Sequence, residues 1–258
     1  MTRQIDLNCD LGESFGAWTM GADAAVMPYI SSANIACGFH AGDPDTMRRT
    51  VALAAQAKVA IGAHVSLPDL AGFGRREMRV SADEAHAMTL YQIGALAAFV
   101  RAAGTRLCHV KPHGALYNMA ARDATLADAI AQAVRAFDPS LRLVGLAGSE
   151  LPRAGARIGL AVAHEAFADR RYQDDGALTP RSEAGAVIED IDAAVAQALA
   201  IARCEPVTTR SGGTRVLRAD TICVHGDRPD AGEFARRLHV ALLGADVAVA
   251  TLLRERIA

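Results

Sequence analysis

The sequence lacks the features of a membrane protein or of a secreted, disulfide-bonded one. No apolar run reaches the roughly 18 residues that indicate a membrane span, and the N-terminal residues show no secretory signal pattern. The cysteines are few, odd in number and without CxxC pairing, so they indicate neither a disulfide framework nor a zinc ribbon. They are Cys9, Cys37, Cys108, Cys204 and Cys223. We therefore expect a soluble, cytoplasmic protein with reduced thiols.

A surplus of one charge and a recognisable phosphate-binding motif are also lacking. The formal net charge is -2, and Lys and Arg are scattered, which leaves no electrostatic footprint for nucleic acid or anionic lipid. No GxxxxGK[ST] motif occurs, and Gly72 and Gly74 are too weakly patterned to form a phosphate loop. The expected partners are small molecules or proteins, and the chain alone should hydrolyse little ATP.

The length and the proportions of apolar and charged residues are those of one globular α/β domain. The chain has 258 residues, of which 51% are apolar and 22% charged, and α/β barrels of about 250 residues commonly fold as one unit. Short β-like runs alternate with Ala-rich helical patterns, which indicates repeated βα units around a parallel sheet. The predicted strands are residues 5–8, 33–36, 60–63, 107–110, 143–146, 159–163 and 221–224. One domain over residues 1–258 is expected, with a β-hairpin inserted at 205–219 around Ser211, Gly212 and Gly213.

Helix signals lie between these strands. Asp43 followed by Pro44 predicts an N-cap and first helical position. Ser81 with Glu84 predicts a capping box at the start of a long helix that ends near Gly104. Two further predicted helices complete the pattern. One is capped by Asp230 and Glu233 and ends at Gly244, and the other is an amphipathic helix over 184–203 that lies against the barrel.

Ionisable side chains gather at or just beyond the carboxyl ends of the predicted strands, where parallel α/β folds form their sites. The candidates are Asn8, Asp10, Glu13, His40, His64, Lys111, His113, Glu165, Asp169 and His225. Any one of them has an ordinary explanation as a solvated loop residue or a hydrogen-bonded core histidine. Lys111 has the fewest such explanations, because an apolar strand rarely ends in Lys unless its ammonium meets an anion. His86, His109 and His239 lie on helix surfaces or inside a strand and are interpreted as structural.

A metal site stays open at this stage. Asp10, His40, His64 and His113 offer the oxygen and imidazole ligands that suit zinc or manganese. No HExxH motif or tight histidine spacing supports them, so a divalent metal is possible but is not indicated by the pattern.

Six blocks of the sequence together resemble the LamB/YcsF family, which is also the family of the 5-oxoprolinase A subunits. They are DLNCDLGESFG, SANIACGFHAGDP, GAHVSLPDLAGFGRR, VKPHGALYN, EAFADRRY and CVHGD, and they span residues 6–227. The resemblance implies a seven-stranded α/β barrel of the glycoside hydrolase and deacetylase type, which agrees with the seven strands counted above. It also implies hydrolysis of the lactam 5-oxo-L-proline to L-glutamate at the expense of ATP. Two other 5-oxoprolinase subunits, of the PxpB and PxpC type, would act with the chain and bind most of the ATP.

Within that implied activity, the candidate residues take different roles. Asp10 or His64 would orient the attacking water, while Lys111 and His113 would stabilise phosphate or oxyanion charge. The remaining candidates, Asn8, Glu13, His40, Glu165, Asp169 and His225, would bind substrate. Two alternatives remain open, a metal-dependent deacetylase or amidohydrolase that acts alone and a non-catalytic module that binds a lactam or carbohydrate.

Overall fold

Seven parallel strands close into a barrel in the computed structural model, which describes residues 3–252. The strands follow one another around the barrel in chain order, and the last of them pairs back onto the first. They are β1 (Arg3–Leu11), β2 (Ser32–Ala36), β3 (Ala60–Val65), β4 (Leu107–Pro112), β5 (Arg142–Leu146), β6 (Ala161–Phe167) and β9 (Thr221–His225). The predicted seven-stranded barrel is therefore confirmed. A further short strand, β10 (Val247–Val249), was not predicted and pairs with residues 3–5 of β1.

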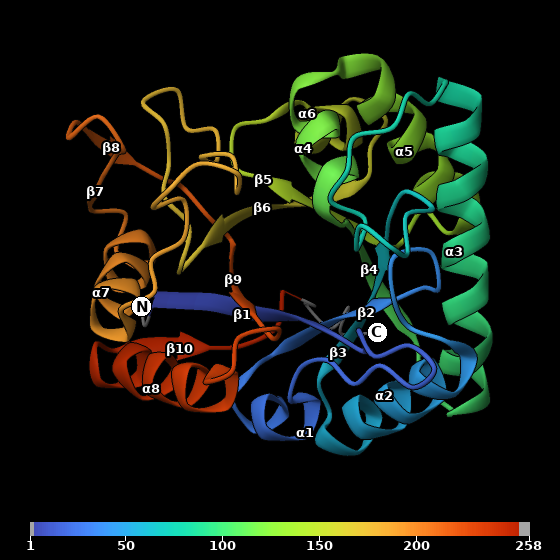
Figure 1. The fold of residues 1–258 in the computed structure, drawn as a ribbon, viewed down its shortest axis with the longest axis horizontal. Helices are drawn as coiled ribbons and strands as arrows, with labels where there is room; N and C mark the ends of the chain where they lie inside the picture. Colours follow the sequence, from blue (N-terminus) through green and yellow to red (C-terminus); the bar gives the residue numbers. More distant parts are fainter. Residues whose placement is uncertain (1–2, 253–258) are drawn as a thin grey trace.

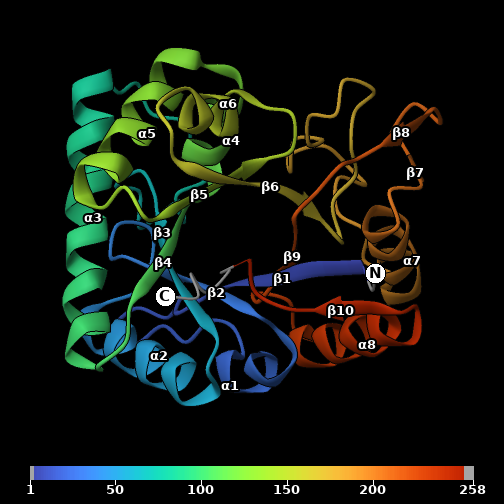
Figure 2. The ribbon, with the colours of Figure 1, turned by 180° about the vertical axis from the view of Figure 1, so that it is seen from behind.

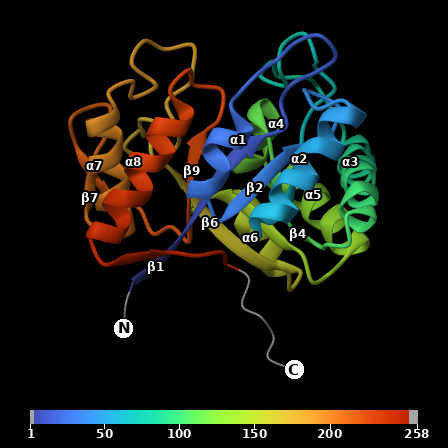
Figure 3. The same cartoon turned by 90° about the horizontal axis from the view of Figure 1, so that it is seen from below.

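Helices surround the strands on the outside (Figure 1). They are α1 (Asp23–Val26), α2 (Pro44–Ala57), α3 (Ala82–Ala102), α4 (Gly114–Arg122), α5 (Ala124–Phe137), α6 (Glu150–Arg157), α7 (Ile191–Ala202) and α8 (Ala231–Gly244), with a 3-10 turn at Met27–Tyr29. The views from behind and from below show α3 and α5 on one side of the barrel and α7 and α8 on the opposite side (Figure 2 and Figure 3). No helix within residues 3–252 is long and apolar enough to cross a membrane.

Two of the three predicted helix caps are confirmed. The Asp43 carboxylate accepts a hydrogen bond from the Thr46 amide at 2.8 Å, and Ser81 and Glu84 form a reciprocal capping box. The capping box predicted at Asp230 is wrong, since the Asp230 carboxylate accepts from the Arg228 guanidinium at 2.8 Å and caps no amide. An arginine two residues away offers the carboxylate a stronger, charge-assisted hydrogen bond than a helix amide does.

The segment after β6 differs from its prediction. The strand predicted over 159–163 occupies Ala161–Phe167, so Glu165 lies inside it. The helix predicted over 184–203 begins only at Ile191, where Asp190 accepts from the Ala193 amide. Residues 184–190, where the predicted helix was to begin, instead bond back to the chain that leaves β6. The Ile188 amide, for example, donates to the Asp169 carbonyl. Pairing with a distant segment thus overrides the local helical pattern. Further on, β7 (Pro206–Thr208) pairs antiparallel with β8 (Thr214–Val216) inside the region predicted as a hairpin.

The barrel interior is polar, whereas the layer between strands and helices is apolar. Along β1, Asp6, Asn8 and Asp10 face the interior, while Leu7, Cys9 and Leu11 belong to the apolar core. This alternation follows from the two-residue period of a strand. The interior side chains hydrogen-bond one another from strand to strand, which satisfies groups that would otherwise be costly to bury. Polar chemistry therefore extends from the bottom of the barrel to its mouth.

Candidate active site

A cavity of about 540 Å³ opens at the carboxyl ends of the strands. Six of the ten predicted site residues line it, which are Asp10, Glu13, His64, Lys111, His113 and His225. The other four, Asn8, His40, Glu165 and Asp169, are buried beside the lining residues and contact them. The structure thus gathers the predicted residues into one site with a lining and a supporting layer.

Lys111 stands at the centre of the site with an almost fully buried side chain. Its ammonium donates to Asp10 at 2.9 Å and to Asn8 at 3.2 Å, lies 2.8 Å from Glu165, and approaches the Cys223 thiol at 3.2 Å. Three ammonium hydrogens are therefore already engaged by the protein. The carboxylates of Asp10 and Glu165 thus supply the anions that a buried ammonium group requires.

Asp10 connects this lysine to the histidines. Its second carboxylate oxygen lies 3.2 Å from His64 Nε2, and Asn34 donates to the first at 2.8 Å. Burial alone would raise the pKa of Asp10, but the neighbouring His64 ring and the Lys111 ammonium outweigh it and hold that pKa well below its usual range. Asp10 is therefore ionised while facing the cavity.

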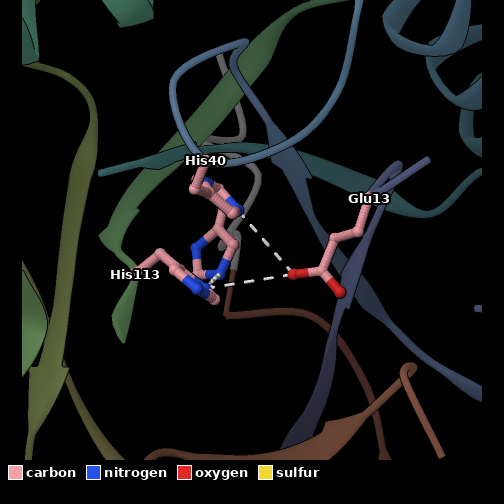
Figure 4. A group of neighbouring side chains, drawn as sticks. Glu13, His40 and His113 are labelled. Atoms are coloured by element: carbon pink, nitrogen blue, oxygen red, sulfur yellow. Dashed lines mark hydrogen bonds and ion pairs between the residues drawn. The ribbon is translucent and has the colours of Figure 1, made fainter. Parts of the chain in front are cut away.

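Three histidines and a glutamate form a compact group that we call the histidine cluster, defined as Glu13, His40, His64 and His113. The rings of His40 and His113 stack with centroids 3.9 Å apart, and His64 meets both edge-on. Glu13 Oε1 lies 3.7 Å from His40 Nε2 and 3.9 Å from His113 Nδ1, as Figure 4 shows. Burial lowers the pKa of His40 and of His113 and raises the pKa of Glu13.

Two glycine loops hold the histidine cluster in place. Gly42, at a φ of +79°, packs so tightly on Ala36 that a side chain there would meet its carbonyl oxygen at 2.6 Å, and this turn fixes the loop that carries His40. Gly74, at a φ of +63°, leaves room for His40 and His113 beneath it. The preceding residue, Phe73, packs edge-on against both rings. The GFG segment, which carries no phosphate-loop pattern, thus covers the histidines.

Asp169 and His225 form a second pair at the mouth. His225 Nδ1 lies 2.8 Å from the Asp169 carboxylate, and the Phe167 ring stacks on the imidazole with centroids 5.8 Å apart. The neighbouring imidazole lowers the pKa of Asp169 although burial opposes the change. The carboxylate orients the ring, so that its other nitrogen is free to meet a ligand.

Several residues of the site were not predicted. Arg75 lines the cavity and donates to Asp227 at 2.8 Å, and both belong to sequence blocks that carried the family resemblance. Arg181 also lines the cavity, and among the described residues it has no hydrogen-bonded partner. It lies in the irregular segment between β6 and α7, where no sequence pattern signals a site. Asn34 was missed because an amide inside a strand has no motif.

The described residues contain two groups that could hold a metal ion, each with its donor atoms within 4.8 Å of one another. One is the histidine cluster, and the other consists of Asp10, Cys223 and His225. The predicted ligands His40, His64 and His113 thus meet in the first group, whereas Asp10 falls in the second.

Comparison with known proteins places the chain in a family. The model of the LamB/YcsF family matches residues 5–256. A protein of Methylococcus capsulatus, named as the A subunit of 5-oxoprolinase, is 60% identical over 252 residues, which cover 98% of this chain and 97% of that protein. A protein of the same name from Bacillus subtilis is 56% identical over 253 residues, covering 98% of each chain. The crystal structure of a lactam utilization protein from Thermus thermophilus superposes with a TM-score of 0.90 at 49% identity, covering 96% of this chain and 99% of that one. The chain therefore belongs to the LamB/YcsF family.

Proposed function

We propose that this member of the LamB/YcsF family is the hydrolytic subunit of a 5-oxoprolinase, which opens the lactam ring of 5-oxo-L-proline to give L-glutamate. The observation that carries the proposal is the name shared by relatives that are 56–60% identical over nearly the whole chain. Because that name describes one lettered subunit, it indicates an enzyme of more than one subunit. The cavity at the barrel mouth supplies the chemistry, since it combines an ionised carboxylate with imidazoles and arginines.

A five-membered lactam is a resonance-stabilised amide, so water attacks it only slowly unless the amide is first activated. In the proposed reaction, partner subunits use ATP to phosphorylate the amide oxygen, which makes the ring carbon electrophilic. Water then adds to that carbon and the carbon–nitrogen bond breaks as the nitrogen takes up a proton, which leaves an acyl phosphate. A second water hydrolyses the acyl phosphate and so releases the phosphate. ATP and water are consumed, and glutamate, ADP and phosphate are released.

Asp10 is the residue best placed to accept the proton from the attacking water. Its carboxylate is ionised, lines the cavity and is held in one orientation by Asn34 and Lys111. His64, 3.2 Å away, can share that proton. Lys111 has its donors engaged and acts here by keeping Asp10 ionised, rather than by meeting the substrate.

Anionic parts of the substrate need cationic or hydrogen-bonding partners that line the cavity. Arg181 has no hydrogen-bonded partner among the described residues, whereas Arg75, which shares the cavity lining with it, is paired with Asp227 at 2.8 Å. A guanidinium matches the geometry of a carboxylate or phosphate with two parallel hydrogen bonds. These arginines and His225 are therefore proposed to bind the carboxylate of the lactam or the phosphate added to it.

The test is reconstitution of the full chain with its two candidate partner subunits, followed by measurement of glutamate formed from 5-oxo-L-proline. Glutamate should form only with ATP, and the chain alone should show no substrate-stimulated ATP hydrolysis. Asp10→Asn should lower turnover by about 10²–10⁴-fold, the range for loss of a general base. Asp83→Asn, at a surface position of α3, is the matched control and should turn over normally.

Two results would overturn the proposal. One is full turnover by Asp10→Asn with an unchanged fold. The other is release of acetate from acylated sugars by the chain alone, without ATP, which would instead favour a free-standing deacetylase.

A further inference from the structure

The histidine cluster brings together side chains from the ends of four neighbouring strands, β1 to β4. All four are buried, with exposed fractions between 1% and 6%. One donor atom from each lies within 4.8 Å of the donor atoms of the others. The mechanism proposed above gives His40 and Glu13 no task, although burying four ionisable groups so closely is costly.

Two backbone carbonyls set the direction of the imidazole lone pairs. His64 Nδ1 lies 3.0 Å from the Lys111 carbonyl oxygen, and His113 Nε2 lies 2.9 Å from the Phe73 carbonyl oxygen. A carbonyl only accepts, so each of these nitrogens donates a hydrogen. The two remaining nitrogens, His64 Nε2 and His113 Nδ1, then face each other at 3.0 Å. The two nitrogens repel unless a proton or a metal ion lies between them, and an ion there would also face the Asp10 carboxylate, which lies 3.2 Å from His64 Nε2.

A ring nitrogen bonded to a carbonyl on one side, with its other nitrogen aimed into a cluster, is the usual arrangement of metal-binding histidine. Here two of the three histidines have it.

His40 supplies an independent observation. Its side chain is 1% exposed, and neither ring nitrogen has a hydrogen-bond partner among the described residues. An unpaired buried polar group costs about 1–3 kcal/mol. His40 Nε2 points toward Glu13 Oε1 across 3.7 Å, too far for a hydrogen bond but suited to an intervening ion (Figure 4).

We propose that the histidine cluster binds one divalent transition-metal ion of the zinc type, with Glu13, His40, His64 and His113 as its ligands. Three imidazoles and one carboxylate are a donor set that zinc accepts in tetrahedral sites. With metal–ligand bonds of about 2.0–2.1 Å, tetrahedral donor atoms lie about 3.3 Å apart. The separations of 3.0, 3.7 and 3.9 Å in the cluster bracket that value.

Binding requires one movement. The stacked rings of His40 and His113 differ in plane by only 8°, and an ion cannot lie in the planes of two parallel rings. His40 is the ring that turns, because its nitrogens have no hydrogen bond to break. Ion binding and rotation of His40 are therefore one event.

The second candidate group, Asp10 with Cys223 and His225, is disfavoured by its own cation. The Lys111 ammonium already contacts Asp10 at 2.9 Å and Cys223 at 3.2 Å, and it would repel a divalent ion there. Burial also raises the pKa of the Cys223 thiol, which keeps it protonated. The inference thus concerns the histidine cluster alone and does not depend on the proposed function.

The experiment uses the full chain after removal of metals with a chelator. Zn²⁺ alone is titrated against it by equilibrium dialysis with elemental analysis, and Co²⁺ alone is added as a spectroscopic probe. We expect one Zn²⁺ per chain, a rise in the melting temperature on binding, and an intense visible Co²⁺ spectrum of a tetrahedral nitrogen and oxygen site. A near-ultraviolet thiolate band of Co²⁺ would show that a cysteine is a ligand and would overturn the inference.

Two ligand variants and a control locate the ion. His40→Gln and Glu13→Gln should each weaken Zn²⁺ binding by at least about 100-fold, since even residues that only support ligands cost 10–100-fold. His86→Gln removes a histidine on α3, outside the cluster, and should bind like wild type. The metal-free melting temperature of each variant shows whether it has folded, and Glu13→Gln serves if His40→Gln has not. Absence of stoichiometric binding by wild type, or equal binding by wild type and both folded ligand variants, would refute the site.

Discussion

Two aspartates on one strand, four residues apart, show how differently the two ends of the barrel interior are built. Asp6, near the bottom, accepts hydrogen bonds from the hydroxyls of Ser31, Ser32 and Thr221. Asp10, at the mouth, contacts the Lys111 ammonium and the His64 ring. Burial raises the pKa of Asp6 and the neutral hydroxyls only partly offset it, whereas at Asp10 the neighbouring His64 ring and Lys111 ammonium outweigh burial and lower the pKa.

The two ends of the barrel interior also differ in the size of their cavities. The void at the bottom measures only about 20 Å³. The mouth holds the large cavity, and buried atoms without hydrogen-bond partners lie in or beside it on His40, Ser149 and Glu165, whereas at the bottom such an atom is found on Arg142. A polar group that is fully paired stabilises the fold, and one that is left unpaired is available to a ligand. The difference separates structural from functional polar residues within one barrel.

Removing the cation at the mouth is expected to have the largest effect on stability. Lys111→Met leaves the buried Asp10 and Glu165 carboxylates without their ammonium, so we expect a loss of about 3–5 kcal/mol in the free energy of unfolding. Urea denaturation measures it, and Lys58→Met, at the only other lysine and an exposed position, is the control. A second variant that adds Glu165→Gln and Asp10→Asn to Lys111→Met should recover much of the loss.

If Lys111→Met unfolds like wild type, the charges at the mouth are not balanced as the distances indicate. Failure of the triple variant to recover stability would instead show that packing of the lysine stem dominates.

The barrel and most of the site could be predicted because their signals are local or repeat along the chain. The alternation of βα units fixed the number of barrel strands, and each strand placed its last polar residues at the same rim. What Lys111 contacts could not be predicted, since Asp10 and Glu165 lie 101 and 54 positions away and meet it only through barrel closure. A lysine that faces a ligand and one that holds two carboxylates have the same sequence signature.

The prediction failed where distant pairing decides the structure. The residues from 184 to 190 have helical spacing, yet they bond back to the segment after β6. The helices α4, α5 and α6 were not individually predicted, and β10 depends on pairing with the first residues of β1, 244 positions away. Arg181 could not be predicted, because it lies in the irregular segment between β6 and α7 and the contacts of that segment bring it to the cavity.

Deleting one serine hydroxyl in each region should have a smaller effect. Ser32 at the bottom donates to Asp6 at 2.6 Å, whereas the hydroxyl of Ser149, beside the cavity, is buried without a partner among the described residues. Ser32→Ala should cost about 1–3 kcal/mol of unfolding free energy, as for leaving a buried acceptor without its donor, and Ser149→Ala should change it by less than about 0.5 kcal/mol. Both variants lose the same atom from a buried serine, so urea denaturation compares the partners directly. Equal losses would mean that hydrogen bonding does not separate the two regions.

The smallest expected effect concerns the pH dependence that Asp6 gives to stability. Its folded pKa is raised above the unfolded value of about 3.9, so the folded protein binds the Asp6 proton more tightly than the unfolded chain does. The stability that this proton contributes is present below the unfolded pKa and is lost as the pH rises through the folded pKa. The unfolding free energy falls with pH by at most about 1.4 kcal/mol per pH unit, the limit for one proton.

Asp6→Asn cannot titrate, so its unfolding free energy should lack this decline and the gap between variant and wild type should narrow as the pH rises above about 4. Urea denaturation in steps from about pH 3.5 to 8 measures that gap, with Asp83→Asn as a surface control whose difference from wild type stays flat. A gap that widens with pH would show that Asp6 is stabilised as an anion like Asp10, and the bottom of the barrel would then be a charged region too.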